Sequence, residues 1–243
     1  MTSGQHEHDT VPRAERGVLR TTPDTYGTSR NGLPLQVHLP PDGAAIRHVV
    51  FCAIHGTEPD STVIVSSALR SILPGQLRCA VVLAANPDGV LMGTRGNAAG
   101  VELNRNWPTS DWSAEQPPHR WTLEDPQDVR LSSGPEPGSE PEVGALRDLI
   151  ERLDAPSIVS VHSPLACVDD PGDSKLGRWF SERTGLERMA DVGYPTLGSF
   201  GTWARERGRP SITYELPRES INEMVGTHSP VFAALLRGEA PID

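Results

Sequence analysis

The chain has 243 residues, of which 22 are Lys or Arg and 32 are Asp or Glu, and its formal net charge is −10. The length suits one large domain, and no block of Lys and Arg supplies the basic face that nucleic-acid binding needs. No apolar stretch of 18 residues occurs, so no membrane-spanning helix is expected. Neither nucleic acid nor a membrane is therefore expected as a partner.

The first twelve residues are polar and lack the apolar segment of a signal peptide. We expect residues 1–12 to be a disordered tail and residues 13–243 to form one domain. The cysteines, Cys52, Cys79 and Cys167, are odd in number and lack zinc-finger spacing. They indicate a reducing, cytoplasmic location.

Four apolar runs predict strands that are buried on both faces. These runs cover residues 48–54, 79–85, 156–162 and 210–216. Segments with helical patterns cover residues 61–73, 139–153, 173–185, 198–208 and 229–238. The alternation of strands and helices predicts an α/β domain with a twisted, mixed but largely parallel sheet and helices on both faces.

Capping residues predict where two of these helices begin. Ser139 and Glu142 have the spacing of a capping box, and Pro141 falls in the first turn. Ser229 directly precedes Pro230, which is the pattern of an N-cap followed by a proline at the first helical position. The last helix is therefore expected to begin at this serine.

Polar side chains follow each predicted strand, at or near its carboxyl end. His55 follows the first strand, Asn86 and Asp88 follow the second, His162 ends the third, and Glu215 lies near the end of the fourth. In folds of this class, ligands bind outside the carboxyl ends of the strands. The sequence therefore predicts a functional site at this edge of the sheet.

His55 and Glu58 lie three residues apart, which lets both side chains point at one atom in a tight turn. Together with the distant His162 they make a three-ligand zinc set with a fourth position open to water. An isolated H-x-x-E pair is more often a surface pair or a helix face. The position of both elements at strand ends favours the metal site.

Glu215 is a carboxylate within a buried strand. It shares one face with Thr213, while Ile212, Tyr214 and Leu216 share the other. An unpaired carboxylate there is costly or has a shifted pKa. Glu215 is therefore either the partner of an arginine in a salt bridge or a general base that takes a proton from water.

The segment 93–108, GTRGNAAGVELNRNWP, contains Arg95, Asn104 and Arg105. Its glycines fit neither the dinucleotide-binding pattern nor the P-loop. Arginine binds carboxylates through two parallel hydrogen bonds. The segment is thus either a carboxylate-binding loop or a turn with solvated arginines.

These residues, together with the segments NPDGV, LNRNWP, PGSEPE, PLACVDDP, GSFGTW and YELP, resemble the zinc carboxypeptidase family over nearly the whole chain. Within that family the chain looks like the amidases that cleave the γ-D-glutamyl–meso-diaminopimelate bond of cell-wall peptides. The resemblance implies a zinc-carboxypeptidase-like fold, one Zn²⁺ per chain and a murein tripeptide as substrate.

The resemblance also implies roles for the residues that match the family's motifs. His55, Glu58 and His162 match its zinc ligands, Glu215 matches its catalytic glutamate, and Arg95 matches an arginine that stabilises the oxyanion. The positions that match substrate-binding residues are Asn104, Arg105, Ser163 and Tyr194.

Three positions depart from the family's pattern. Thr57 replaces the usual Asp beside the ligands, and Glu102 replaces an Asp that orients the first zinc histidine. Gly201 stands where digestive carboxypeptidases have the residue at the base of their specificity pocket. A glycine there implies a roomier pocket, suited to a long polar side chain.

Two other functions stay open. An N-acyl amino acid deacylase of the aspartoacylase and succinylglutamate desuccinylase type uses a similar zinc triad and asparagine–arginine pair, although NPDG, PLACVDDP and GSFGTW favour the amidase. A zinc-bearing, non-catalytic binding protein is disfavoured by the presence of Glu215. The sequence does not decide whether diaminopimelate or lysine is the preferred residue of the substrate. It also leaves the oligomeric state open, and a homodimer is one of the possibilities.

Overall fold

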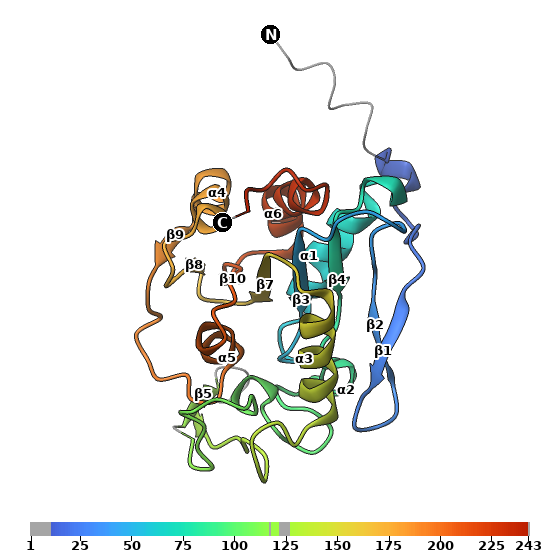
Figure 1. Ribbon diagram of the computed structural model, residues 1–243. Helices are drawn as coiled ribbons and strands as arrows, with labels where there is room; N and C mark the ends of the chain where they lie inside the picture. Colours follow the sequence, from blue (N-terminus) through green and yellow to red (C-terminus); the bar gives the residue numbers. More distant parts are fainter. Residues whose placement is uncertain (1–10, 117, 122–126, 243) are drawn as a thin grey trace.

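The computed structural model describes residues 11–116, 118–121 and 127–242 (Figure 1). Within these residues, six strands form a central sheet in the order β4-β3-β7-β10-β8-β9. Their bounds are β3 His48–Cys52, β4 Cys79–Val82, β7 Ser157–His162, β8 Cys167–Asp169, β9 Glu187–Met189 and β10 Ser211–Glu215. Each of the four predicted strands is present and is shorter than its apolar run.

The sheet is mixed and mostly parallel, as predicted. Strands β4, β3, β7 and β10 are parallel neighbours, β8 is antiparallel to β10, and β9 is parallel to β8. The register pairs Cys52 with Val161, and Glu215 with His162. The carboxyl ends of β3, β7 and β10 therefore meet at one edge.

Helices cover both faces of the sheet (Figure 1). Their bounds are α1 Pro59–Arg70, α2 Pro87–Met92, α3 Pro141–Leu153, α4 Lys175–Thr184, α5 Phe200–Glu206 and α6 Ile221–Leu236. Short 3₁₀ helices add η1 Arg13–Glu15, η2 Pro74–Gln76 and η3 Leu103–Arg105. Helices α1, α4 and α6 pack on one face of the sheet, and α3 and α5 pack on the other.

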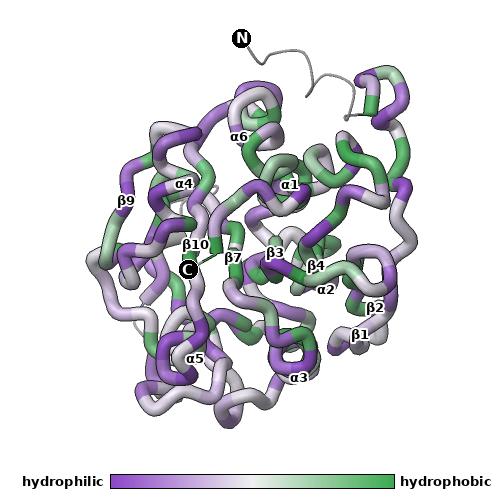
Figure 2. The backbone as a smooth tube through the Cα atoms, turned by 45° about the horizontal axis from the view of Figure 1, so that its top comes forward, coloured by the Kyte–Doolittle hydropathy of each residue, from purple (hydrophilic) through white to green (hydrophobic). Residues whose placement is uncertain are grey.

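Side-chain alternation along the strands produces two hydrophobic cores. Val50 and Cys52 belong to the core under α1, α4 and α6, whereas Val49 and Phe51 belong to the core under α3 and α5. All of β3 is buried, as expected for a strand covered on both faces. Figure 2 shows apolar colouring along the strands in the middle of the molecule.

Short strands outside the four apolar runs were not predicted. Strands β1, Asp24–Thr28, and β2, Pro34–Val37, form an antiparallel hairpin, and β5, His119–Trp121, pairs with β6, Gln127–Val129. The hairpin lies against α3, where a Cβ on Gly27 would be only 2.5 Å from that of Ala145. Glycine thus permits this close approach.

The prediction for the last helix was wrong at its start. Helix α6 begins at Ile221 rather than at Ser229, and Pro230 lies inside it. Ser220 caps the helix in a capping box with Glu223. The S-x-x-E pattern is therefore the true start signal, and the Ser229 hydroxyl instead donates to a backbone carbonyl of α1.

The capping box predicted for α3 does not form either. Glu140 is the N-cap, and the Ser139 hydroxyl donates to its carboxylate at 2.9 Å. The Glu142 carboxylate accepts hydrogen bonds from the Arg30 N–H and the Asn97 amide, at 2.8 and 3.1 Å. The two buried acids thus connect loops to the helix.

Most of the predicted tail, residues 1–10, lies outside the described residues. Val11 is buried and its N–H donates to the Ser71 carbonyl at 2.8 Å, so this residue of the segment packs against the domain. All three cysteines are buried and free. None of the described helices combines the length and apolar character needed to cross a bilayer.

We predict that Ser220→Ala lowers the free energy of unfolding by about 0.5–2 kcal/mol, because the first turn of α6 loses its side-chain acceptor. Ser220→Asp should retain most of the stability, because a carboxylate can accept the same N–H group. Urea denaturation of the three proteins checks this. Equal midpoints for the alanine variant and wild type would contradict this capping role of Ser220.

Candidate active site

The turn between β3 and α1 brings His55 and Glu58 together. Ala53 adopts a left-handed conformation, with φ of 50°, directly after β3. A Cβ on Gly56 would lie 2.0 Å from the carbonyl carbon of Gly89, so glycine is required where the two backbones cross. Glu58 is the N-cap residue of α1, where the helix dipole favours a negative charge.

His55, Glu58 and His162 form a buried cluster at the carboxyl edge of the sheet. The His55 Nδ1 lies 2.8 Å from Glu58 Oε1, and the His162 Nδ1 lies 3.0 Å from Oε2. One ligand-type atom from each residue lies within 4.8 Å of the others. The side chains are only 4–7% exposed. Two imidazoles and a carboxylate are a common donor set of catalytic zinc.

The outer ring nitrogens of both histidines also have neighbours. Ser160 Oγ lies 2.8 Å from His162 Nε2, and Glu102 Oε1 lies 3.2 Å from His55 Nε2, close enough for an ion pair but not aligned as a hydrogen bond. Contacts of this kind orient metal-binding histidines and leave the inner nitrogen for the ion. The residues present therefore fit a zinc ion.

The contact of Glu102 with His55 was left open by the sequence, and that of Ser160 with His162 was not predicted. The signal for Ser160 was available, because residues two apart on a strand share a face and Ser160 precedes His162 by two.

Charged neighbours set the pKa values in this cluster. Burial opposes ionisation of Glu58, but His55 and His162 hold its pKa well below the ordinary value. Burial likewise opposes ionisation of Glu102, but Arg95 holds its pKa well below the ordinary value. The Arg95 guanidinium lies 3.2 Å from Glu58 and 2.9 Å from Glu102. The structure thus brings Arg95 directly against the cluster.

Glu215 lies beside the cluster because β10 pairs it with His162. The side chain faces away from the core that contains Ile212 and Tyr214, as the alternation predicted. Its carboxylate accepts a hydrogen bond from the Leu165 N–H at 3.3 Å. Burial raises the pKa of Glu215, with the nearby His162 opposing the rise. Among the described residues Glu215 forms no salt bridge, which removes the main support for a purely structural role.

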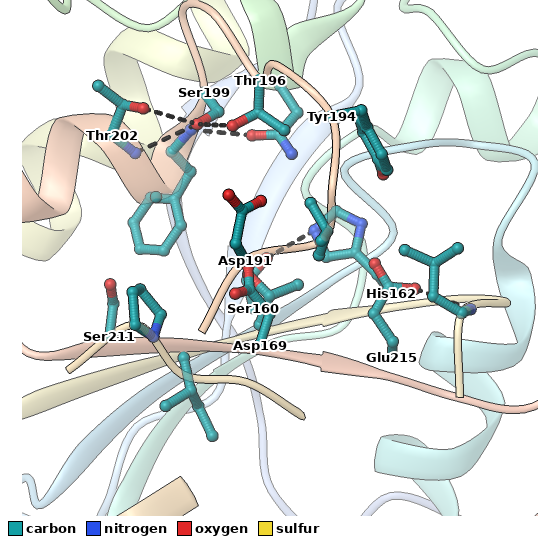
Figure 3. Close-up of a pocket in the computed structure, with 18 of the residues that line it drawn as sticks. Ser160, His162, Asp169, Asp191, Tyr194, Thr196, Ser199, Thr202, Ser211 and Glu215 are labelled. Carbon is teal, nitrogen blue, oxygen red and sulfur yellow. Dashed lines mark hydrogen bonds between the residues drawn. The ribbon is translucent and has the colours of Figure 1, made fainter. Parts of the chain in front are cut away.

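The residues predicted to bind substrate line one open cavity of about 1690 Å³ together with the cluster. The Asn104 Oδ1 accepts from the Phe200 N–H at 2.9 Å, and Arg105 donates to the Asn104 carbonyl at 2.7 Å. The Ser163 N–H donates to Glu58 at 3.3 Å. Tyr194 is 48% exposed on the segment before α5, and it lies near Glu215 and His162 in Figure 3.

Two polar residues that follow a predicted strand do not join the site. The Asn86 side chain caps α2 by accepting from the Gly89 N–H at 2.9 Å. The Asp88 carboxylate accepts from the Ser29 hydroxyl and the Asn31 N–H, both at 3.0 Å. These two side chains hold loops in place and do not line the cavity.

Comparison with known proteins identifies the family. The sequence profile described as Zinc carboxypeptidase matches residues 20–175. The chain is 41% identical to murein peptide amidase A of Escherichia coli (strain K12) over 229 residues, which are 94% of this chain and 95% of that protein. It is also 41% identical to murein peptide amidase A of Vibrio campbellii, over 93% of this chain and 92% of that protein.

Solved structures agree with this relationship. The crystal structure of the murein-tripeptide amidase from Escherichia coli O157 matches with a TM-score of 0.90 and 41% identity, over 96% of this chain and 99% of that chain. Bovine thrombin-activatable fibrinolysis inhibitor, in complex with tick carboxypeptidase inhibitor, matches with a TM-score of 0.69 and 18% identity, over 89% and 88%. That more distant match supports the fold alone.

We predict that His162→Ala weakens Zn²⁺ binding by more than the roughly 10–100-fold typical of losing a residue that only orients a ligand, because it removes one of the donors. His119→Ala is the matched control, since His119 lines the same cavity but lies outside the cluster. Competition with a chromogenic chelator measures both affinities. Equal affinities for the two variants would contradict the ligand assignment.

Proposed function

The chain belongs to the zinc carboxypeptidase family, and from this premise we propose that it is a zinc-dependent amidase of murein peptides. The bond cleaved is the γ-D-glutamyl–meso-diaminopimelate amide, in the recycling or degradation of cell-wall peptides. The observation that carries the proposal is the His55–Glu58–His162 cluster beside Glu215 in a chain 41% identical to murein peptide amidase A along nearly its whole length.

His55, Glu58 and His162 would hold one Zn²⁺, since their inner donor atoms face one another in a buried cluster. A zinc ion bound in such a site lowers the pKa of water toward ~7 and polarises the scissile carbonyl. Ser160 and Glu102 hold the two imidazole rings in place from behind. The metal donors therefore need little rearrangement on binding.

Glu215 is the general base in this proposal. Its carboxylate is buried next to His162 and has no arginine partner among the described residues. It accepts a proton from the attacking water and then delivers it to the leaving amine of the diaminopimelate residue. Because burial disfavours its charged form, the carboxylate accepts that proton more readily than an exposed glutamate.

Arginines supply the positive charge around the reacting amide. The Arg95 guanidinium, fixed between Glu58 and Glu102, stabilises the negative charge that develops on the carbonyl oxygen. Arg105 and Asn104 bind the carboxylate that adjoins the scissile amide, since they lie side by side at the cavity wall.

Ser163 and Tyr194 complete the substrate-binding cleft. Ser163 follows the third metal donor directly, and its N–H is tied to Glu58. Tyr194 is half-exposed at the cavity and lies on the segment between β9 and α5. Its ring closes over the bound peptide in this proposal.

We also propose a cytoplasmic location, which is supported by three cysteines that are all free and buried. The expected partner is a small murein peptide. The net charge of −10 continues to argue against nucleic acid.

The deacylase alternative is disfavoured, because the relatives at 41% identity are amidases of murein peptides. Assays with N-acetylaspartate and N-succinylglutamate separate the two functions. Robust hydrolysis of either compound without cleavage of L-Ala-γ-D-Glu-meso-diaminopimelate would overturn the amidase proposal.

We predict that Glu215→Gln keeps its zinc but lowers turnover of the tripeptide by roughly 10²–10⁴-fold, the range for losing a positioned general base. Glu151→Gln, which makes the same change on the exposed surface of α3, should leave turnover unchanged. Zinc content and steady-state rates check both variants. Near-normal turnover in Glu215→Gln would show that this carboxylate is structural.

We predict that Arg105→Ala retains zinc but lowers kcat/KM by about 10- to 150-fold, the equivalent of losing a hydrogen bond to a charged group worth about 1.5–3 kcal/mol. Wild type should discriminate by a similar factor against a tripeptide whose carboxylate beside the scissile amide is a carboxamide. Arg105→Ala should lose most of that discrimination, whereas Arg147→Ala, on the surface of α3, should keep it. An unchanged preference in Arg105→Ala would show that another group binds the carboxylate.

A further inference from the structure

The cavity continues from Glu215 along the face of the sheet toward the amino end of β10. There Ser160 of β7, Thr213 of β10 and Asp169 of β8 stand directly opposite one another in the register. Directly opposed residues point to the same face, so Asp169 shares the face of Glu215. It lies about 7 Å further back along the strand direction, since two residues separate Thr213 from Glu215.

The Asp169 carboxylate is unusual because it is half-buried and makes no hydrogen bond or ion pair with any residue that the structure describes. Burial, together with the neighbouring carboxylates of Asp191 and Asp170, raises the pKa of Asp169 to about 6. Asp170, by contrast, accepts hydrogen bonds from the Ser174 N–H at 2.8 Å and from Arg188 at 3.3 Å. Of these two neighbouring aspartates, Asp169 is therefore the one without a direct hydrogen-bond or ion-pair partner among the described residues.

Asp191 adds a second carboxylate to the same cavity from the segment between β9 and α5. One of its oxygens accepts from the Gly193 N–H at 2.7 Å, which positions the side chain. Figure 3 shows Asp169 and Asp191 in the middle of the pocket, beside His162. Each of these carboxylates disfavours ionisation of the other, and a bound ammonium group would relieve that repulsion.

Helix α5 brings a positive charge to this end of the cavity. Arg205 lines it and donates to the Thr202 hydroxyl at 3.3 Å. It lies close enough to Asp169 to oppose the rise in that pKa. On the same helix, a Cβ on Gly201 would meet only the Ser199 hydroxyl, at 3.9 Å. The wall is thus open there, as a long side chain requires.

We propose that Asp169 and Asp191 bind the ammonium, and Arg205 the carboxylate, at the far end of the substrate's diaminopimelate side chain. The inference rests on the proposed function, because it takes the scissile amide to lie at Glu215. Diaminopimelate is a lysine with an additional carboxylate on the carbon that carries the side-chain ammonium. The two aspartates can bind the side-chain ammonium of either lysine or diaminopimelate. Arg205 can bind only the additional carboxylate, so it favours diaminopimelate.

The test compares three tripeptides, L-Ala-γ-D-Glu-X, in which X is meso-diaminopimelate, L-lysine or L-norleucine. Wild type should cleave them in that order of kcat/KM. The norleucine side chain carries neither the ammonium nor the distal carboxylate. The rate with this peptide therefore measures cleavage in the absence of the proposed charge contacts.

Asp169→Asn and Asp191→Asn should each lower kcat/KM by roughly 10- to 150-fold for the two charged peptides and leave the norleucine peptide unchanged. Arg205→Gln should lower kcat/KM for the diaminopimelate peptide alone. Asp148→Asn, on a 66% exposed side chain of α3, is the matched control and should change none of the three. Zinc content and thermal midpoints confirm that each variant is folded.

An equal loss for all three peptides in the aspartate variants would overturn the subsite and assign these carboxylates to structure. A wild type that cleaves the norleucine peptide as well as the diaminopimelate peptide would also overturn it. In both cases the amidase proposal survives, because the peptides are still cleaved. If zinc-loaded wild type cleaves none of them, the amidase proposal fails and this inference fails with it.

Discussion

The site depends on one carboxylate that contacts two imidazoles. Each oxygen of Glu58 lies beside a different histidine, His55 from the turn after β3 and His162 from the end of β7. A buried carboxylate is tolerated only where donors satisfy it, and here the Ser163 N–H and Arg95 add to the histidines. Removing any one partner leaves charge uncompensated in a buried place, which is strongly destabilising. The chemistry and the local fold are thus coupled through the same atoms.

The parallel register then decides which other groups reach that carboxylate. Because β7 pairs with both β3 and β10, the ends of three strands meet, and Glu215 comes opposite His162. Successive side chains of β10 point to opposite faces of the sheet, so Tyr214 packs in the core while Glu215 lines the cavity. The antiparallel strand β8 extends the same face, which places Asp169 in line with Thr213. One sheet face therefore carries both the proposed general base and the residues that we propose bind the substrate's side chain.

Strong local patterns made part of this predictable. Buried strands appear as continuous apolar runs, and a histidine or acid that ends such a run stands out, as His55, His162 and Glu215 do. The short strand that bears Asp169 has no such run, and its pairing with β10 is a tertiary contact that no local pattern encodes. The start of α6 was missed for another reason. Ser229 stands directly before Pro230 and an apolar run, a pattern that also marks helix starts, whereas the true cap is formed by Ser220 and Glu223.

The distribution of charge bears on how a protein of net charge −10 would recognise the acidic peptide that we propose as its substrate. Long-range repulsion must be overcome by a few local cations, and the contacts distinguish among the arginines. Arg95 is hydrogen-bonded to the carboxylates of both Glu58 and Glu102. The Arg105 guanidinium is farther from Glu102, at 3.8 Å. The charge of Arg105 is therefore less fully neutralised by protein carboxylates and is available to a ligand.

Elsewhere in the same cavity, Arg205 lies near Asp169, which has no direct ion pair among the described residues. A peptide with a single carboxylate near the scissile bond and a zwitterion at the far end of its side chain matches this order of charges, whereas a uniformly acidic peptide does not.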